Sequence, residues 1–486
     1  MQISTSPKSQ NHGKARQFVT AVILNLATVS FGISCGWSSP VAPQLRSSHS
    51  PVGNAAASYD EIAWITSLPA IGGFVTIPFC GSLSERIGRK NFAILSGLPH
   101  IVFWLLKIFA QNLNYLYAAR FINGMAIAMT VFIVPVYTSE VATEDVRGVI
   151  GSLLLFSINI GILFAYIVGA FLSYRLLGIL SLIFPVVFVV AMTFIPETPA
   201  YLVRRHRPIE ARKSLMFYRG NNRALVEQEL FHLRSTSSSY DHSAKTDVSL
   251  SEFFRDRASR KGLIISMGLL AAQQLSGIVA MTNYAETIFK LAGSSVSSEI
   301  SSIIVATIQI IGSQASTMSM ERAGRRLLSL ISCFGMASSL GIVAIFFHMQ
   351  KNNYNVSSIS WLPLIALSSF IIAYCLGIGP VPFVIVSEVF DLKVSSLATT
   401  LCFAFFFIIG FTGLRTFDLM MQFYGIDKCF FMLVAISVTS FVFCYCFLPE
   451  TKGRKREDII NELTGNDKVR LALDVDSKLL KKLESV

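Results

Sequence analysis

The sequence predicts an all-α membrane protein with twelve transmembrane helices in two six-helix bundles and short cytoplasmic helices between the bundles. Of the 486 residues, 52% are hydrophobic and only 14% are charged, whereas soluble proteins carry about a quarter charged residues. One charged motif also occurs twice: Glu85-Arg-Ile-Gly-Arg89 returns as Glu321-Arg-Ala-Gly-Arg325. An arginine-rich glycine turn cannot lie in hydrocarbon, so each copy marks a loop at a membrane surface. The sequence therefore indicates an internal duplication, with two similar halves.

Twelve apolar segments of about 20 residues, the length that a bilayer requires, follow one another along the chain. They cover 18–40, 62–80, 91–110, 116–136, 149–172, 176–195, 262–288, 300–319, 327–348, 361–385, 396–419 and 429–448. The first run is expected to be a retained span, because no cleavage pattern follows it. Several runs contain Gly and Pro, as in Gly377-Ile-Gly-Pro-Val-Pro382, which breaks helices where a cavity or a gate is lined.

These segments divide the chain into five regions. We expect a cytoplasmic N-terminus at 1–17, an N-terminal six-helix bundle at 18–195, a cytoplasmic helical linker at 196–261, a C-terminal six-helix bundle at 262–450 and a cytoplasmic tail at 451–486. The linker is basic, and its pattern from Ile209 to Arg219 indicates short helices.

Lys and Arg residues gather in alternate loops, and the richer side of a membrane protein is the cytoplasmic one. The loops with Arg86 and Arg325 belong to that side, so both termini are predicted to lie inside the cell. Asn355 begins an Asn-Val-Ser sequon on the predicted outer side, which makes it a candidate glycosylation site.

Composition also argues against several functions. The formal net charge of +12 comes from basic residues that are spread over loops, so we expect no nucleic-acid partner. The eight cysteines lie mostly in apolar runs without zinc spacing. There is no phosphate-binding loop or nucleophile arrangement, so we expect no enzyme activity, metal or cofactor. Membrane lipid is the surrounding partner, and we expect the monomer to be functional.

Eight motifs in order resemble those of the sugar porter family of the major facilitator superfamily. They are Gly81…Arg89-Lys90, Arg120-Phe-Ile-Asn-Gly124, Pro135-Val-Tyr-Thr-Ser-Glu140 with Arg147-Gly148, Pro196-Glu-Thr-Pro199, Gln273-Gln-Leu-Ser-Gly-Ile278, Glu321-Arg-Ala-Gly-Arg-Arg326, Gly379-Pro-Val-Pro382 with Glu388, and Pro449-Glu-Thr-Lys-Gly453. The resemblance implies the major facilitator fold, a plasma-membrane location and sugar transport by alternating access. Asn159-Ile-Gly-Ile-Leu163 and Ile195-Pro-Glu-Thr-Pro199 are most similar to insect facilitated trehalose transporters.

Repeated charges at the cytoplasmic ends of the spans form a predicted gate. Opposite charges at this boundary can pair across helices and hold the two bundles together on the inside. The alternative is that they are loop charges that only set the topology. The family has an Arg where this chain has Ser395. One latch partner is therefore missing, although Lys393 is close enough in sequence to reach Glu388. A weaker inner latch is predicted. The gate residues are Glu85, Arg89, Glu140, Arg147, Glu321, Arg325 and Glu388.

A sugar site needs amide groups that both donate and accept hydrogen bonds, together with an aromatic face. Amides are expensive within a membrane, so they face either a cavity or a neighbouring helix. Both readings stay open for this chain. The candidate substrate-binding residues are Gln273, Gln274, Gln309, Asn283, Asn159, Phe383 and Tyr284.

The chain departs from the family at several site positions. Where related carriers have polar groups, it has Leu155, Val279, Cys375 and Phe406-Phe407, and Phe383 replaces a tryptophan. Each lost hydrogen bond costs about 1 kcal/mol, so glucose binding by the usual scheme is expected to be weak. A disaccharide or a less polar solute is compatible with this pattern.

The first span contains no Asp or Glu, and Ser34 stands where proton-driven relatives have an acidic residue. Without a titratable group there, we expect downhill uniport. The leading hypothesis is thus a facilitative carrier of trehalose or a hexose such as glucose. The alternatives are a carrier of a non-sugar solute and a transport-poor sugar sensor.

Overall fold

The computed structural model describes residues 7–53, 55–220, 222–243, 250–293, 296–454 and 456–464. The N-terminal half contains α1 (Pro7–Gly36), α2 (Ser38–Leu45), α3 (Tyr59–Ile87), α4 (Arg89–Ile108), α5 (Leu113–Val141), α6 (Glu144–Phe171) and α7 (Tyr174–Thr193). The linker contains α8 (Pro199–Arg204), α9 (Pro208–Tyr218), α10 (Arg223–Ser243) and α11 (Leu250–Arg255).

The C-terminal half repeats the pattern of long helices. It contains α12 (Arg257–Leu275), α13 (Ile278–Ala292), α14 (Ser298–Ala323), α15 (Arg325–Lys351), the 3-10 turn η1 (Ser357–Ile359), α16 (Leu362–Leu376), α17 (Val381–Glu388), α18 (Leu392–Phe423) and α19 (Ile426–Phe447), followed by α20 (Arg456–Thr464). Within the described residues, eleven helical segments are long and apolar enough to cross a membrane. The 26-residue helix α14 completes the twelve-helix arrangement.

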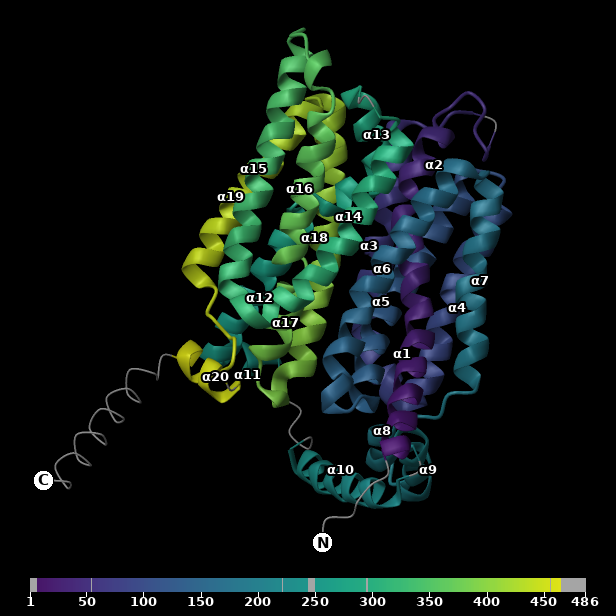
Figure 1. The fold of residues 1–486 in the computed structure, drawn as a ribbon, viewed down its shortest axis with the longest axis vertical. Coiled ribbons are helices and arrows are strands. Elements are labelled where there is room, and N and C mark those ends of the chain that lie inside the picture. The colour runs from purple at the N-terminus through teal and green to yellow at the C-terminus, as the bar shows by residue number, and fades with distance from the viewer. Residues whose placement is uncertain are drawn as a thin grey trace, which may run out of the picture.

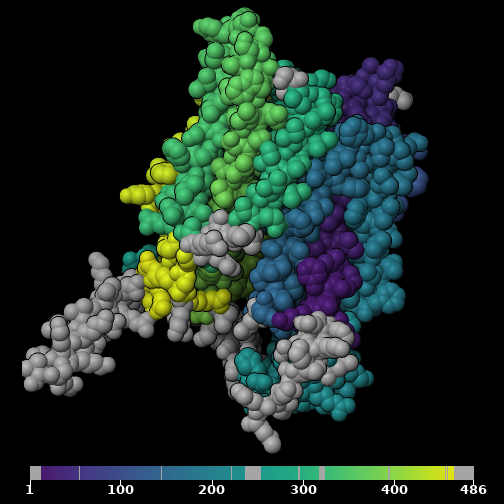
Figure 2. Space-filling model, viewed as in Figure 1, coloured from purple at the N-terminus to yellow at the C-terminus, as the bar shows by residue number. Residues whose placement is uncertain are grey.

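The two halves lie side by side (Figure 1). Helices α1–α7 are on one side and α12–α19 on the other, and Figure 2 shows the purple-to-blue half meeting the green-to-yellow half along a seam. The helices α8–α11 and α20 lie together at one end of the bundle (Figure 1). We call this the terminal end and the other the opposite end.

Small residues allow close packing inside the N-terminal half. A Cβ atom on Gly124 of α5 would lie 1.9 Å from the carbonyl oxygen of Pro69 on α3. Similarly, a Cβ atom on Gly161 of α6 would lie 2.3 Å from the carbonyl oxygen of Val29 on α1. Membrane helices have little hydrophobic drive to associate, so such close backbone contact supplies much of their attraction.

The span α12–α13 is broken in mid-course. Gly277 has a left-handed φ of +96° between the two helices, and its Cβ position would lie 2.7 Å from Leu433. A glycine is favoured here because other residues rarely adopt this backbone conformation. Gln273 and Gln274 lie in the last turn before this break, where freed backbone groups and polar side chains occur together.

Most contacts between the halves are made by α3 with α18, α6 with α14, and α2 with α13, and α1 also contacts α13. The Tyr166 hydroxyl donates to the Thr282 carbonyl over 2.7 Å, and the backbone N–H of Glu286 donates to Ser39 Oγ over 3.0 Å. Phe407 of α18 lies buried in the hydrophobic core of the N-terminal half. Between side chains that the structure describes, no hydrogen bond or ion pair joins the halves at the terminal end. This conformation is therefore held closed at the opposite end.

Candidate functional site

Gln273 is almost completely buried beside the break between α16 and α17. Its Nε2 donates to the carbonyl oxygen of Gly379 over 2.5 Å and lies 3.4 Å from the Tyr374 hydroxyl. Its Oε1 has no hydrogen-bond partner among the described residues. The Nε2 group of this amide thus braces a helix break, and its Oε1 is a buried acceptor.

Gln274 points toward a different helix and is more exposed. Its Nε2 lies 3.4 Å from the carbonyl oxygen of Phe406 on α18, next to Gly410. Successive helix residues point about 100° apart, which explains why the two glutamines face different neighbours. Such a long hydrogen bond is weak, so the Gln274 amide is held less firmly than that of Gln273.

Gln309 and Asn159 join the two halves in the middle of the bundle. Gln309 Nε2 on α14 donates to Asn159 Oδ1 on α6 over 3.0 Å, and both side chains are buried. Sequence reasoning left open whether Asn159 packs against a helix or binds a ligand. In this conformation one predicted site amide donates to the other.

The other candidate site residues lie apart from this amide pair. Asn283 donates to the Val279 carbonyl of its own helix over 2.8 Å. The Tyr284 hydroxyl lies 3.0 Å from Thr66 Oγ1 at the contact between the halves. The Phe383 ring packs against the rings of Phe403 and Phe406, with centroids 6.0 Å away in both cases.

The predicted gate residues form two ion-pair clusters. On the N-terminal side, buried Arg89 contacts Glu85 and lies 3.4 Å from Glu140, which also pairs with Arg204 of α8 over 2.8 Å. On the C-terminal side, Arg325 pairs with Glu388 over 3.1 Å.

Neither cluster joins the two halves: the N-terminal cluster includes Arg204 of the linker helix α8, and Arg325 and Glu388 both belong to the C-terminal half. Arg147 contacts the Ala142 carbonyl of its own half over 3.4 Å, and Glu321 lies outside the residues whose side chains are described. The sequence led us to expect pairing that holds the two bundles together. In this conformation no pair between described gate residues joins the two halves, which fits a molecule closed at its opposite end.

The repeated Pro-Glu-Thr motif has a structural role that sequence reasoning missed. Glu197 accepts the backbone N–H of Lys90 at the start of α4, over 3.0 and 3.1 Å. Glu450 accepts the N–H groups of Arg325 and Arg326 at the start of α15, over 2.9 and 3.1 Å. Carboxylates at helix N-termini are favourable because the N–H groups there lack other partners. Both this motif and the glycine turn occur once in each half, and this shared repetition was the sequence signal that could have revealed their contact.

The surroundings of the two carboxylates differ. Burial raises the pKa of Glu197. Burial also acts to raise the pKa of Glu450, but hydrogen bonds from the N–H groups of Lys452, Arg325 and Arg326 outweigh it and lower that pKa. Equivalent positions in the two halves therefore hold differently stabilised charges.

The sequence reasoning also did not single out two buried cationic side chains of the N-terminal half, Lys107 and Arg120, as a pair. Lys107 Nζ lies 3.1 Å from the ring centroid of Trp37 and 4.0 Å from that of Phe103. Arg120 donates to the Ser34 carbonyl over 2.9 Å and also contacts Ser38. Aromatic faces attract cations that lack water. Arg120 was visible in a motif, whereas Lys107 looked like an ordinary residue at the end of an apolar run.

The predicted glycosylation site is at the opposite end. Asn355 is exposed, and its Oδ1 accepts the backbone N–H of Ser357 over 3.1 Å. Its place fits a surface loop, as a glycosylated asparagine requires.

Residues 20–463 match the family model described as "Sugar (and other) transporter". This chain belongs to that family. The transporter is 30% identical to the facilitated trehalose transporter Tret1 of Bombyx mori over 455 residues, which cover 93% of this chain and 88% of the relative. It is also 30% identical to Tret1 of Anopheles gambiae over 449 residues, or 92% of this chain and 56% of the relative. The chain thus spans only about half the length of several of these curated relatives.

Solved structures show the same fold. The proton:xylose symporter XylE bound to 6-bromo-6-deoxy-D-glucose has a TM-score of 0.74 and 20% identity, covering 92% of this transporter and 99% of that chain. The inward-open conformation of XylE from E. coli has a TM-score of 0.75 and 19% identity, covering 91% and 99%. The chain is accordingly a multi-pass membrane protein of the sugar porter type and is similar to Tret1.

Proposed function

We propose that this transporter is a facilitative uniporter that carries trehalose or a hexose by alternating access. The observation that carries the proposal is the arrangement of amides at the centre: Gln273 and Gln274 lie just before the helix break, and Gln309 meets Asn159 across the two halves. Amides that donate and accept suit a ligand rich in hydroxyls. Helix breaks at the interface of two repeats are where carriers of this architecture bind substrate.

The terminal end is proposed to face the cytoplasm, because the Lys- and Arg-rich loops gather there. The outer side is then the opposite end, and this conformation is closed to the outside. The gate is proposed to work when the terminal ends approach, with Glu85, Arg89, Glu140, Arg147, Glu321, Arg325 and Glu388 as its residues. The five regions with boundaries at 17, 195, 261 and 450, the plasma-membrane location, function as a monomer and the use of Asn355 as a glycosylation site belong to the same proposal.

Uptake into proteoliposomes tests the proposed substrate. Radiolabelled trehalose, glucose, fructose and a polyol are each offered, and saturable uptake of trehalose or a hexose is expected. Gln274→Ala should reduce this uptake at least severalfold, because a hydroxyl then loses a partner worth about 1 kcal/mol. Gln350→Ala is the matched control, since this exposed amide contacts the Leu291 carbonyl at the opposite end. Unchanged uptake by the Gln274 variant would remove the site.

The same vesicles test uniport. Uptake should level off when the inside and outside concentrations are equal, and a protonophore should leave it unchanged. Accumulation that collapses with the protonophore would contradict uniport, and binding without flux would favour a sensor.

A carrier of a less polar solute is the second candidate. A small cavity beside Gln309 is lined mostly by apolar side chains, including Met281, Phe289, Val305 and Phe370. This lining, together with Cys375 in the neighbouring wall, favours a solute with an apolar face. Saturable uptake of such a solute without any sugar uptake would select this candidate.

A further inference from the structure

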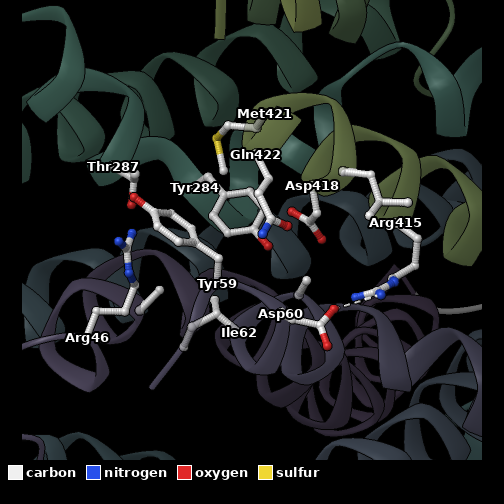
Figure 3. Close-up of a pocket in the computed structure, with 13 residues that line it drawn as sticks. Arg46, Tyr59, Asp60, Ile62, Tyr284, Thr287, Arg415, Asp418, Met421 and Gln422 are labelled. Carbon is white, nitrogen blue, oxygen red and sulfur yellow. Dashed lines mark hydrogen bonds and ion pairs between the residues drawn. The ribbon is translucent and has the colours of Figure 1, made fainter. Parts of the chain in front are cut away.

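An ion pair links the two halves at the opposite end of the molecule. Arg415 of α18 donates to Asp60 of α3 over 2.9 Å (Figure 3). The Arg415 side chain is 18% exposed and that of Asp60 is 60% exposed. The guanidinium carbon of Arg415 also lies 4.7 Å from the ring centroid of Trp64, again on α3. Arg415 is thus held by two side chains of the other half.

A second layer of polar groups lies beside this pair. The Tyr284 hydroxyl of α13 lies 3.0 Å from Thr66 Oγ1 of α3, and it interacts with the carboxyl group of Asp418. Asp418 is buried, and its Oδ2 has no hydrogen-bond partner within the described part of the chain. Figure 3 shows Tyr284, Asp418, Asp60 and Arg415 around one small cavity between the halves.

The Asp60–Arg415 and Thr66–Tyr284 contacts cross the surface that must separate when the carrier opens at this end, whereas Tyr284 and Asp418 belong to the same half. Opening would part α3 from α13 and α18 and would break both cross-half pairs together. At the terminal end, no ion pair between described side chains joins the two halves, so opening there breaks none of them. Among the described residues, the ion-pair cost of opening therefore falls on the opposite end.

We propose that Asp60 and Arg415, supported by Thr66 and Tyr284, form an outer latch that sets the fraction of molecules open to the outside. An ion pair that is partly exposed is worth only a fraction of a kcal/mol to about 1 kcal/mol. Loss of the latch charge on either side should therefore raise the outward-open fraction about two- to fivefold. The inference rests on the proposed alternating-access function and on the proposed orientation.

Labelling of a reporter cysteine tests the latch. Ala63 lines the cavity and is buried in the closed conformation, so Ala63→Cys should react only when the outer end opens. Cys35 and Cys446, the accessible native cysteines of the described residues, are replaced by Ala. A membrane-impermeant maleimide is then applied to intact cells, and the labelling rate is measured.

Asp60→Asn and Arg415→Gln should each raise the labelling rate about two- to fivefold. The exchange of both charges, Asp60→Arg with Arg415→Asp, should bring the rate back toward that of the parent. Lys351→Gln is the matched control, because Lys351 pairs with Asp427 over 3.0 Å at the same end but within one half. It should leave the rate unchanged.

Parent-like rates in both single variants would overturn the latch, as would an exchanged pair that labels no more slowly than the single variants. Surface amount and thermal stability are measured for every variant, and the exchange restores the pair even if one single variant folds poorly. Labelling needs no sugar, so a failure of the latch is distinct from a failure of the substrate proposal. Labelling that rises in inside-out vesicles instead of intact cells would overturn the orientation and, with it, the outer position of the latch.

Discussion

The two Pro-Glu-Thr carboxylates occupy equivalent places, yet we expect their removal to have unequal effects. Glu450 accepts two N–H groups at the start of α15 and a third from Lys452 over 3.0 Å. Hydrogen bonds to a charged group contribute about 1.5–3 kcal/mol. Because Glu450 is partly exposed, we discount this to about 1–2 kcal/mol for Glu450→Gln, which keeps a single acceptor oxygen.

Glu197 should behave differently because burial raises its pKa. Its charged form is therefore disfavoured in the folded state, and at pH 7 part of what its hydrogen bonds contribute is offset. Glu197→Gln removes that charge while leaving an acceptor for the Lys90 N–H. We expect this variant to lose clearly less stability than Glu450→Gln, or none.

The pH dependence separates the two cases further. The folded pKa of Glu450 lies below its unfolded value, so its contribution is present above about pH 4.3 and is lost as the pH falls through the folded pKa. The folded pKa of Glu197 lies above its unfolded value. Its contribution is present below about pH 4.3 and declines as the pH rises through the folded pKa.

Thermal unfolding in detergent measures both variants against the parent. For domains the size of one half, about 1 kcal/mol shifts the midpoint by roughly 2–4 °C. The parent-minus-variant difference for Glu450→Gln should be constant down to about pH 4.3 and should shrink as the pH is lowered further through the folded pKa, and that for Glu197→Gln should not shrink. Equal losses at pH 7 with the same pH trend would refute the burial argument.

Two further predictions concern the moving parts. Asn159→Ala leaves Gln309 without its cross-half partner. A double-mutant cycle with Gln309→Ala, measured as stability in detergent, should give a coupling energy of about 0.6 kcal/mol, and at most about 1.7 kcal/mol. A coupling energy of zero would show that the pair does not hold the halves together. Ser395→Arg should supply the family's missing cation to Glu388, whose Oε2 has no partner among the described residues. Thiol reagents applied from the terminal end should then label the space between the halves more slowly than in the parent, and an equal rate would remove the weak-latch hypothesis.

The fold could be predicted from the sequence because its signals are long and repeated. Hydrocarbon admits few structures, so apolar runs of about 20 residues define spans with little ambiguity. The copied turn around Gly88 and Gly324 then showed that the spans form two related halves, and both glycines do adopt a positive φ, of +98° and +88°. The twelve-helix fold and the family were both predicted correctly.

The candidate site could be predicted only as a set of residue types. A sequence gives the position of an amide along a helix, but not which neighbour its hydrogen bonds reach. Asn283 illustrates this, because a carbonyl of its own helix already satisfies its Nδ2 group. Gln309 and Asn159 lie 150 residues apart and meet only through the packing of α14 on α6.

The outer latch was missed for a related reason. Asp60 and Arg415 are 355 residues apart, each is a charge near the end of a span, and neither belongs to a repeated motif. Repetition points to what the two halves have in common, whereas a contact between the halves depends on how they differ. The repeated charges accordingly pair within each half, and the latch is built from residues that have no copy. If this principle holds, Asp60→Asn should alter the balance between inward and outward states without altering stability at the terminal end, whereas Glu450→Gln should do the reverse.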